Sequence, residues 1–95
     1  RMNTNQKRMA LFEEDLRKTF ELKHLVIEDE SHLHAGHVGA ATGGGHFKVT
    51  IVAPEFIGLN LIERHRAIYK ALNRYFPQEI HALTILAHTP NEFRS

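Results

Sequence analysis

The sequence contains no cysteine, only three prolines and no marked excess of charge of either sign. Without cysteine the chain forms no disulfide and has no thiol chemistry of its own. Such a composition suits a reducing compartment, so we expect a cytoplasmic protein. The net charge of +1 gives no electrostatic case for nucleic acid, which calls for a clear basic excess. No apolar run approaches the length that spans a bilayer, and no signal segment is visible, so no membrane partner is expected.

The length and composition indicate one globular domain over residues 1–95. The chain has 95 residues, 42% of them hydrophobic and 24% charged, as is typical of a soluble globular protein. Residues 1–5 are polar and are expected to be disordered. Arg1 precedes Met2, and we expect the natural start to be Met2.

Hydrophobic periodicity predicts an α+β fold with the order α-β-β-α-β. The predicted elements are helices over 6–22 and 61–75, strands over 24–30, 45–53 and 80–88, and a short final helix over 91–94. The first two strands should form an antiparallel hairpin. The helix between the second and third strands is a crossover, which favours a parallel pair in a mixed three-stranded sheet with the helices on one face.

Apolar spacing also predicts which side chains face the core. In the strand over 45–53, His46, Lys48 and Thr50 alternate with the apolar positions and are expected on the solvent face. Asn3, Thr4 or Asn5 can cap the first helix and Asn60 the second. The predicted core positions are Met9, Phe12, Leu16, Phe20, Leu25, Ile27, Phe47, Val49, Ile51, Leu61, His65, Ile68, Tyr69, Leu72 and Tyr75.

The stretch from Glu30 to His46 is dense in histidine, with His32, His34, His37 and His46 among its residues. Histidine titrates near neutral pH and is the commonest metal ligand. The loop over 31–45 is long for a compact domain, and such loops tend to be functional or disordered. Two interpretations of this loop remain. Its histidines hold a metal or cluster with help from a partner, or the loop is simply solvated and its histidines have no such role.

The predicted topology places His81 near this loop. If the third strand runs parallel to the second, both begin at the same end of the sheet, and His81 begins the third strand. No cysteine or convincing carboxylate completes a ligand set, so a metal site made by this chain alone is disfavoured. No nucleophile or carboxylate pair indicates hydrolytic catalysis. The triple glycine before the second strand is read as a hinge, since it precedes no helix that would bind anions.

Several motifs, in order and spacing over about residues 6 to 94, resemble the BolA family. They are Glu30-Ser31-His32-Leu33-His34-Ala35-Gly36-His37, His46-Phe47-Lys48-Val49-Thr50-Ile51-Val52, Phe56-Ile57-Gly58, Arg64-His65-Arg66-Ala67-Ile68-Tyr69, Ile80-His81-Ala82-Leu83 and Thr89-Pro90-Asn91-Glu92. The resemblance implies a KH-like fold of class II, with short extra helical turns and the second helix in a helix-turn-helix-like position.

The resemblance also implies a non-enzymatic accessory protein that shares a [2Fe-2S] cluster with a monothiol glutaredoxin, in iron–sulfur handling or in iron or redox sensing. The glutaredoxin and glutathione would supply thiolates, and the BolA-like chain would supply two imidazoles. His81 matches one ligand and His34 the other, with His37 and His32 close enough to substitute. No cluster is expected on the chain alone. Imidazole ligands would raise the cluster potential relative to thiolates and make its binding depend on pH.

The alternative implied by the same resemblance is a DNA-binding regulator of stress or morphology genes. Arg64, Arg66, Lys70 and Arg74 on the second helix would contact the phosphates, or else an acidic partner. The GxxG loop with which KH domains grip nucleic acid is absent from the corresponding segment, 52–58. For Arg64 and Arg66 a simple solvated helix face is the competing reading.

Overall fold

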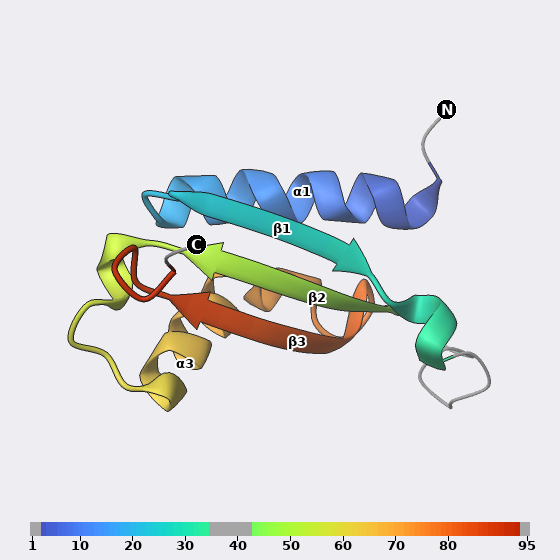
Figure 1. Cartoon of the computed structure of the whole chain (residues 1–95). Coiled ribbons are helices and arrows are strands. Elements are labelled where there is room, and N and C mark those ends of the chain that lie inside the picture. The colour runs from blue at the N-terminus through green and yellow to red at the C-terminus, as the bar shows by residue number, and fades with distance from the viewer. Residues whose placement is uncertain (1–2, 35–42, 94–95) are drawn as a thin grey trace.

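The computed structural model describes residues 3–34 and 43–93. Its described elements follow the predicted order α-β-β-α-β, with short 3-10 turns between them (Figure 1). The elements are α1 (Thr4–Thr19), β1 (His24–Asp29), η1 (Ser31–His34), β2 (Gly45–Val52), η2 (Pro54–Phe56), α3 (Leu61–Ala71), η3 (Asn73–Tyr75) and β3 (Ile80–His88).

The first helix begins earlier than its apolar period predicts. Asn3 caps α1 by accepting a hydrogen bond from the Gln6 amide, and the Gln6 side chain accepts one from the Asn3 amide. This reciprocal capping box satisfies two amide groups that the first helical turn leaves without partners. Thr4 and Asn5 are therefore helical, and the prediction that residues 1–5 are disordered is wrong for the described residues 3–5.

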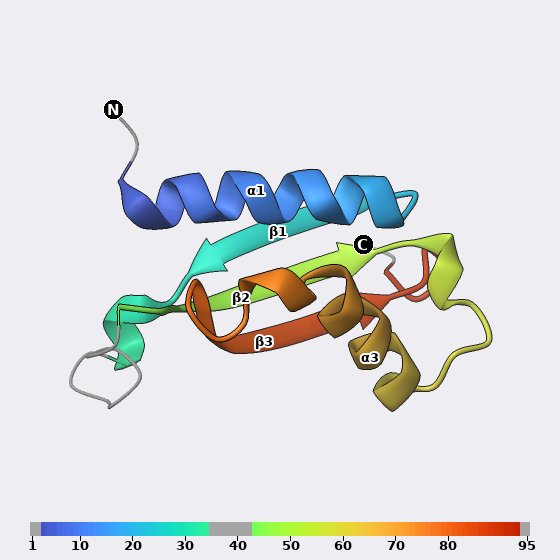
Figure 2. The same ribbon diagram turned by 180° about the vertical axis from the view of Figure 1, so that it is seen from behind.

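The three strands form one mixed sheet in the order β1-β2-β3, as predicted. β1 pairs antiparallel with β2, and Leu25 lies opposite Ile51. β2 pairs parallel with β3, and Val49 lies opposite Ile85. Figures 1 and 2 show α1 and α3 on one face of this sheet, and no helix of the described residues lies on the opposite face. The prediction of helices on a single face is confirmed.

The core fills the space between the helices and the sheet. Phe12 of α1 lies at its centre, with its ring edge-on to Phe47 of β2 at 5.1 Å and to Tyr75 of η3 at 4.8 Å. The buried hydrophobic core residues are Phe12, Leu16, Phe20, Phe47, Val49, Ile51, Ala53, Phe56, Ile68, Leu72, Tyr75, Ile80, Ile85 and Ala87. Leu61 and Tyr69, both predicted to face the core, are exposed instead.

Three helix predictions need correction at their ends. The helix predicted over 6–22 ends at Thr19, and Phe20 caps it in an extended conformation. The helix predicted over 61–75 ends at Ala71, and the chain continues as the separate turn η3, which still buries Tyr75. Residues 90–92 form a hydrogen-bonded turn rather than the start of a helix over 91–94, of which Arg94 lies outside the described residues. In this turn Glu92 and Thr89 exchange hydrogen bonds between amide and side chain in both directions. The side chains thereby satisfy the local amides without a continuing helix.

Candidate metal-binding site at the base of the histidine-rich loop

Two histidines from neighbouring strands meet at the end of the sheet where the histidine-rich loop joins β2. His46 is the second residue of β2 and His81 the second of β3. Their ring centroids lie 5.2 Å apart, with the ring planes inclined by 41°. Because β2 and β3 are parallel, both strands begin at this end. The prediction that the start of β3 lies beside the end of the loop is therefore confirmed for His46.

A register shift between the strands brings these rings together. Gly45 pairs with Ile80, whereas His46 pairs with Ala82, so His81 is the extra residue of a β-bulge. Bulges bend a strand and re-aim the side chains next to them. His81 is exposed as a result, although simple alternation along β3 would place it on one face with Leu83 and Ile85.

His46 is buried, which corrects its predicted place on a solvent face. Only 5% of the residue is exposed, although alternation along β2 puts it on the side of the strand opposite the core residues Phe47 and Val49. The predicted alternation in β2 is confirmed for Lys48 and Thr50, which lie on the same face as His46 and are partly exposed. The tilted contact with His81 covers part of the His46 ring, and a pattern within one strand does not reveal such a neighbour.

A polar network fixes the backbone of His46. Its amide donates to Ser31 Oγ at 3.1 Å, and its carbonyl accepts from the Glu30 amide at 2.8 Å. The Asn5 side chain donates to Ser31 Oγ at 3.3 Å and to an Asp29 carboxylate oxygen at 3.1 Å. The start of α1 is thus tied to the segment before the loop, and Ser31 links that segment to the start of β2.

Asp29 is the charged member of this network. Burial raises the pKa of its carboxyl, but hydrogen bonds from Ser31 and Asn5 outweigh that effect and hold the pKa below its usual value. The Ser31 amide donates to one carboxylate oxygen at 2.9 Å. Asp29 is therefore ionised at neutral pH and serves as the acceptor around which the end of β1 is organised.

Close packing holds His81 from the other side. The backbone of Gly44 lies so close that a Cβ added there would be 3.2 Å from the His81 Cβ and 3.1 Å from the Gln78 carbonyl oxygen. The Gly45 amide donates to the Glu79 carbonyl at 3.1 Å. Glycine at position 44 therefore lets the loop end approach the start of β3, a role that the hinge prediction did not include.

The structure describes the predicted ligands of the loop only in part, unlike His81. His32 and His34 lie in the turn η1, where His32 is exposed, and the description does not extend to the side chain of His34. His37 lies outside the described residues. Within residues 3–34 and 43–93, no group of three or more histidine, cysteine or acidic side chains is placed to hold a metal ion. His46 was not predicted as a ligand, although the parallel register alone places the first residues of β2 beside His81.

Of the four basic residues proposed for nucleic acid or a partner, Arg64 is held by the fold. Its side chain is only 12% exposed and forms a two-point ion pair with Glu92, at 2.6 and 3.1 Å. It also donates to the carbonyls of Leu59 and Ala87. This pairing lowers the pKa of Glu92 to about 2.

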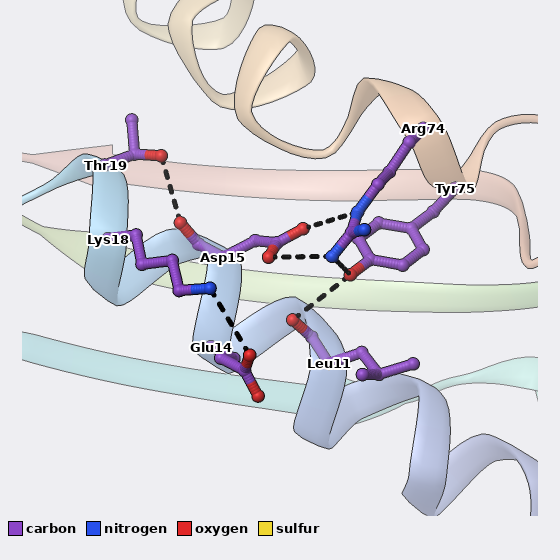
Figure 3. Close-up of polar contacts among 7 residues, drawn as sticks. All are labelled: Leu11, Glu14, Asp15, Lys18, Thr19, Arg74 and Tyr75. Atoms are coloured by element: carbon purple, nitrogen blue, oxygen red, sulfur yellow. Dashed lines mark hydrogen bonds and ion pairs between the residues drawn. The ribbon is translucent and has the colours of Figure 1, made fainter.

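Arg74 is likewise engaged, as Figure 3 shows. Its guanidinium donates to both carboxylate oxygens of Asp15, at 3.0 and 3.1 Å, and lies over the ring of Tyr75. Burial raises the pKa of Asp15, but the hydrogen bonds from Arg74 and Tyr75 hold it below its usual value. Arg66 and Lys70 are exposed on α3. Two of the four predicted basic contact residues therefore form ion pairs that join elements of the fold.

Comparison with known proteins gives a consistent result. A sequence profile of the family described as BolA-like protein matches residues 16–92. Protein BOLA1, chloroplastic, of Arabidopsis thaliana is 41% identical over 90 residues, or 92% of this chain and 56% of that protein. The DNA-binding transcriptional regulator BolA of Haemophilus influenzae is 36% identical over 85 residues, or 90% of this chain and 80% of that protein. The chain thus spans little more than half of the chloroplast relative.

Solved structures agree in fold. The BolA domain of SufE1 from Arabidopsis thaliana superimposes with a TM-score of 0.80 at 36% identity, over 97% of this chain and 99% of that one. BolA1 from the same plant gives a TM-score of 0.77 at 36% identity, over 98% and 100% of the two chains. Separately, none of the helices in the described part of the chain has the length and apolar character needed to cross a bilayer.

Proposed function

This chain belongs to the BolA family, and from that membership and the site we propose that it shares a [2Fe-2S] cluster with a monothiol glutaredoxin. It would act as a non-enzymatic accessory protein in cluster handling or in iron or redox sensing. His81 would provide one imidazole, and a second would come from the loop region, where His34 matches the family pattern and His37 and His32 are the alternatives. Bound in this way, the cluster would supply one-electron redox chemistry.

The observation that carries this proposal is an incomplete set of donors in an accessible place. His81 is exposed at a bulge, and His46 lies beside it. The chain has no cysteine, and its described residues offer no third histidine or acidic side chain in the same cluster. Imidazole is a known ligand of iron in [2Fe-2S] centres that also carry thiolates. An exposed imidazole beside a histidine-rich loop, on a chain without thiols, therefore fits a partner that brings the thiolates.

The test is titration of the purified chain into a cluster-loaded monothiol glutaredoxin. We expect a heterodimer on size-exclusion chromatography and a change in the visible circular dichroism of the cluster. His81→Ala should abolish the spectral change. His88→Ala is the matched control, because it removes a histidine from the opposite end of the same strand and should leave the change intact. An unchanged spectrum with the wild-type chain, or an equal effect of both variants, would contradict the proposal.

Relatives named as DNA-binding regulators favour a second candidate function, direct binding to promoter DNA. On this chain the contacts would fall to Arg66 and Lys70, which are exposed, while Arg64 and Arg74 are held in ion pairs. Direct regulation predicts submicromolar, sequence-selective affinity whose logarithm falls steeply with that of the salt concentration. Weak binding that is indifferent to sequence at physiological salt would remove this candidate.

A further inference from the structure

We propose that the outer edge of β1, together with the groove between β1 and α1, binds an extended segment of a partner protein as a fourth strand of the sheet. The segment runs antiparallel to β1, with aliphatic side chains in the groove and a basic side chain beside Glu28. Because β2 separates β1 from β3, this edge is distinct from His81. The inference does not depend on the function proposed above.

The backbone of β1 offers hydrogen-bonding groups on its outer side. β1 is an edge strand of the sheet. Glu30 donates its amide to the His46 carbonyl, and alternate residues of an antiparallel strand bond to the same neighbour. Leu25 and Ile27 therefore direct their amides and carbonyls away from β2, and no other described residue bonds to these groups. A row of such groups is a template for another strand.

The opposite edge of the sheet is partly closed by a side chain. His88 of β3 directs its carbonyl inward, where it accepts from the Ala53 amide. The neighbouring Ala87 directs its carbonyl outward, and Arg64 of α3 donates to it at 3.2 Å. Proteins protect the edges of their sheets with such contacts, with prolines or with bulges. The six residues of β1 include no proline, and its outer backbone groups have no such side-chain donor in the described structure.

A groove beside β1 supplies contacts for side chains. Met9, Leu25 and Ile27 line it, and all three are partly buried against the core. Side chains of an added strand alternate between the two faces, so every second one would enter this groove. Its apolar walls favour aliphatic side chains there. The groove has a volume of about 280 Å³ and is lined by Gln6, Met9, Ala10, Glu13, Leu25 and Ile27.

The position of α1 selects a single strand rather than a second copy of this chain. Figures 1 and 2 show α1 running alongside β1 toward the outer edge of the sheet. Two copies joined through their β1 edges would have these strands about 4.8 Å apart. Their α1 helices would then overlap, since packed helices need about 8–10 Å between their axes. An extended segment without a covering helix meets no such obstacle.

Charge complementarity defines the chemistry of the segment. Glu28 is exposed, and in the described structure it forms no ion pair. Opposite charges directly across a strand pair are favourable, so a lysine or arginine belongs opposite Glu28. Aliphatic residues belong opposite Leu25 and Ile27. Antiparallel pairing is somewhat more stable per residue than parallel pairing, which sets the direction of the segment.

The probe is a synthetic seven-residue peptide built for this register. It has arginine at position 2 opposite Glu28, valine at positions 3 and 5 opposite Ile27 and Leu25, and threonine elsewhere. We expect binding with a dissociation constant below about 1 mM. NMR should show shifted amides in β1 and along the groove, and slower exchange of the Leu25 and Ile27 amides.

Methylation of single peptide nitrogens tests the strand pairing itself. The amides at positions 3 and 5 of the peptide face β1, whereas the amide at position 4 points away from it. Methylating position 3 or 5 should abolish binding, and methylating position 4 should leave it intact. Equal effects of these changes, no binding at millimolar peptide, or shifts along β3 instead of β1 would overturn the proposal.

Two charge reversals form the matched pair of protein variants. Glu28→Lys should weaken peptide binding about two- to tenfold. Glu14→Lys makes the same change at an exposed position of α1 outside the groove lining and should leave binding unchanged. Equal effects of the two variants would contradict the charge assignment. A dimer of the chain in sedimentation, dissociated by the peptide, would assign the edge to a second copy and overturn the proposed partner.

The proposed function and this inference fail independently. His81→Ala should abolish the spectral change with a glutaredoxin and leave peptide binding unchanged. Glu28→Lys should do the reverse.

Discussion

Gly44 provides a direct way to displace His81 without changing any histidine. In Gly44→Ala the new Cβ would lie 3.1 Å from the carbonyl oxygen of Gln78, 3.2 Å from the Cβ of His81 and 3.3 Å from the carbonyl oxygen of Pro77. All three atoms belong to the backbone or are fixed directly to it, so a side-chain rotation cannot relieve the contact. The segment that leads into β3 must shift, and the His81 ring moves with it.

The expected size of this effect follows from overpacking. Adding a methyl group to a tightly packed site typically destabilises by about 1–3 kcal/mol. In a domain of this size each kcal/mol lowers Tm by about 4–8 °C. Gly58→Ala is the matched control, because Gly58 has a φ of +83° and a Cβ there would meet nothing within 4 Å. Backbone strain in that left-handed conformation should cost about 1–2 kcal/mol.

The two variants should therefore lose similar stability, but only Gly44→Ala should disturb His81. Urea unfolding measures the stability, while NMR of the His81 ring and the visible circular dichroism on mixing with a cluster-loaded monothiol glutaredoxin report on His81. We expect Gly44→Ala to shift the His81 signals and to weaken the spectral change, and Gly58→Ala to alter neither. Equal losses of the spectral change in both variants, or unchanged His81 signals in Gly44→Ala, would refute the reasoning.

Three further predictions concern the contacts that join the elements. The pKa of Glu92, lowered from 4.5 to about 2 chiefly by Arg64, means that the pair stabilises the fold above about pH 4.5 and loses this effect as the pH falls towards 2. The difference in unfolding free energy between wild type and Glu92→Gln should therefore shrink over that interval. Arg74→Ala should raise the pKa of Asp15 towards its usual 3.8, as measured by NMR titration of the carboxyl. Phe12→Leu removes two edge-to-face ring contacts of about 0.5–1.5 kcal/mol each, so it should destabilise by about 1–3 kcal/mol in urea unfolding with an unchanged m-value.

The sheet could be predicted closely because its signals lie within single elements. The third strand was predicted over 80–88, and β3 has these bounds. The helix between β2 and β3 indicated a parallel pair, since a crossover connects such strands. The approach of the start of β3 to the end of the loop followed from that topology without any knowledge of side-chain contacts.

The end of α3 and the burial of His46 could not be predicted in the same way. Ile68, Leu72 and Tyr75 are spaced by four and three residues, which suits a continuous helix as well as a helix followed by the turn that is observed. The bulge at His81 depends on the approach of Gly44 to the chain before β3. Contacts between distant segments produce no hydrophobic periodicity in the sequence, so periodicity cannot predict them.

The placement of the histidines argues against reading their number alone as a functional signal. At the far end of the sheet, His24 and His88 have their ring centroids 4.7 and 5.7 Å from that of Phe93. These two rings pack against an aromatic ring, which accounts for them without a ligand. At the near end, His46 is buried beside the exposed ring of His81.

His81 differs from the two rings at the far end in its exposure. Its ring is exposed at the bulge, and the close approach of Gly44 holds its backbone in place. A partner can therefore reach this imidazole, whereas the rings of His24 and His88 pack against Phe93. The contrast between the two ends of the sheet favours a ligand role for His81 and a packing role for His24 and His88, and it is the neighbours of each ring that decide between the two.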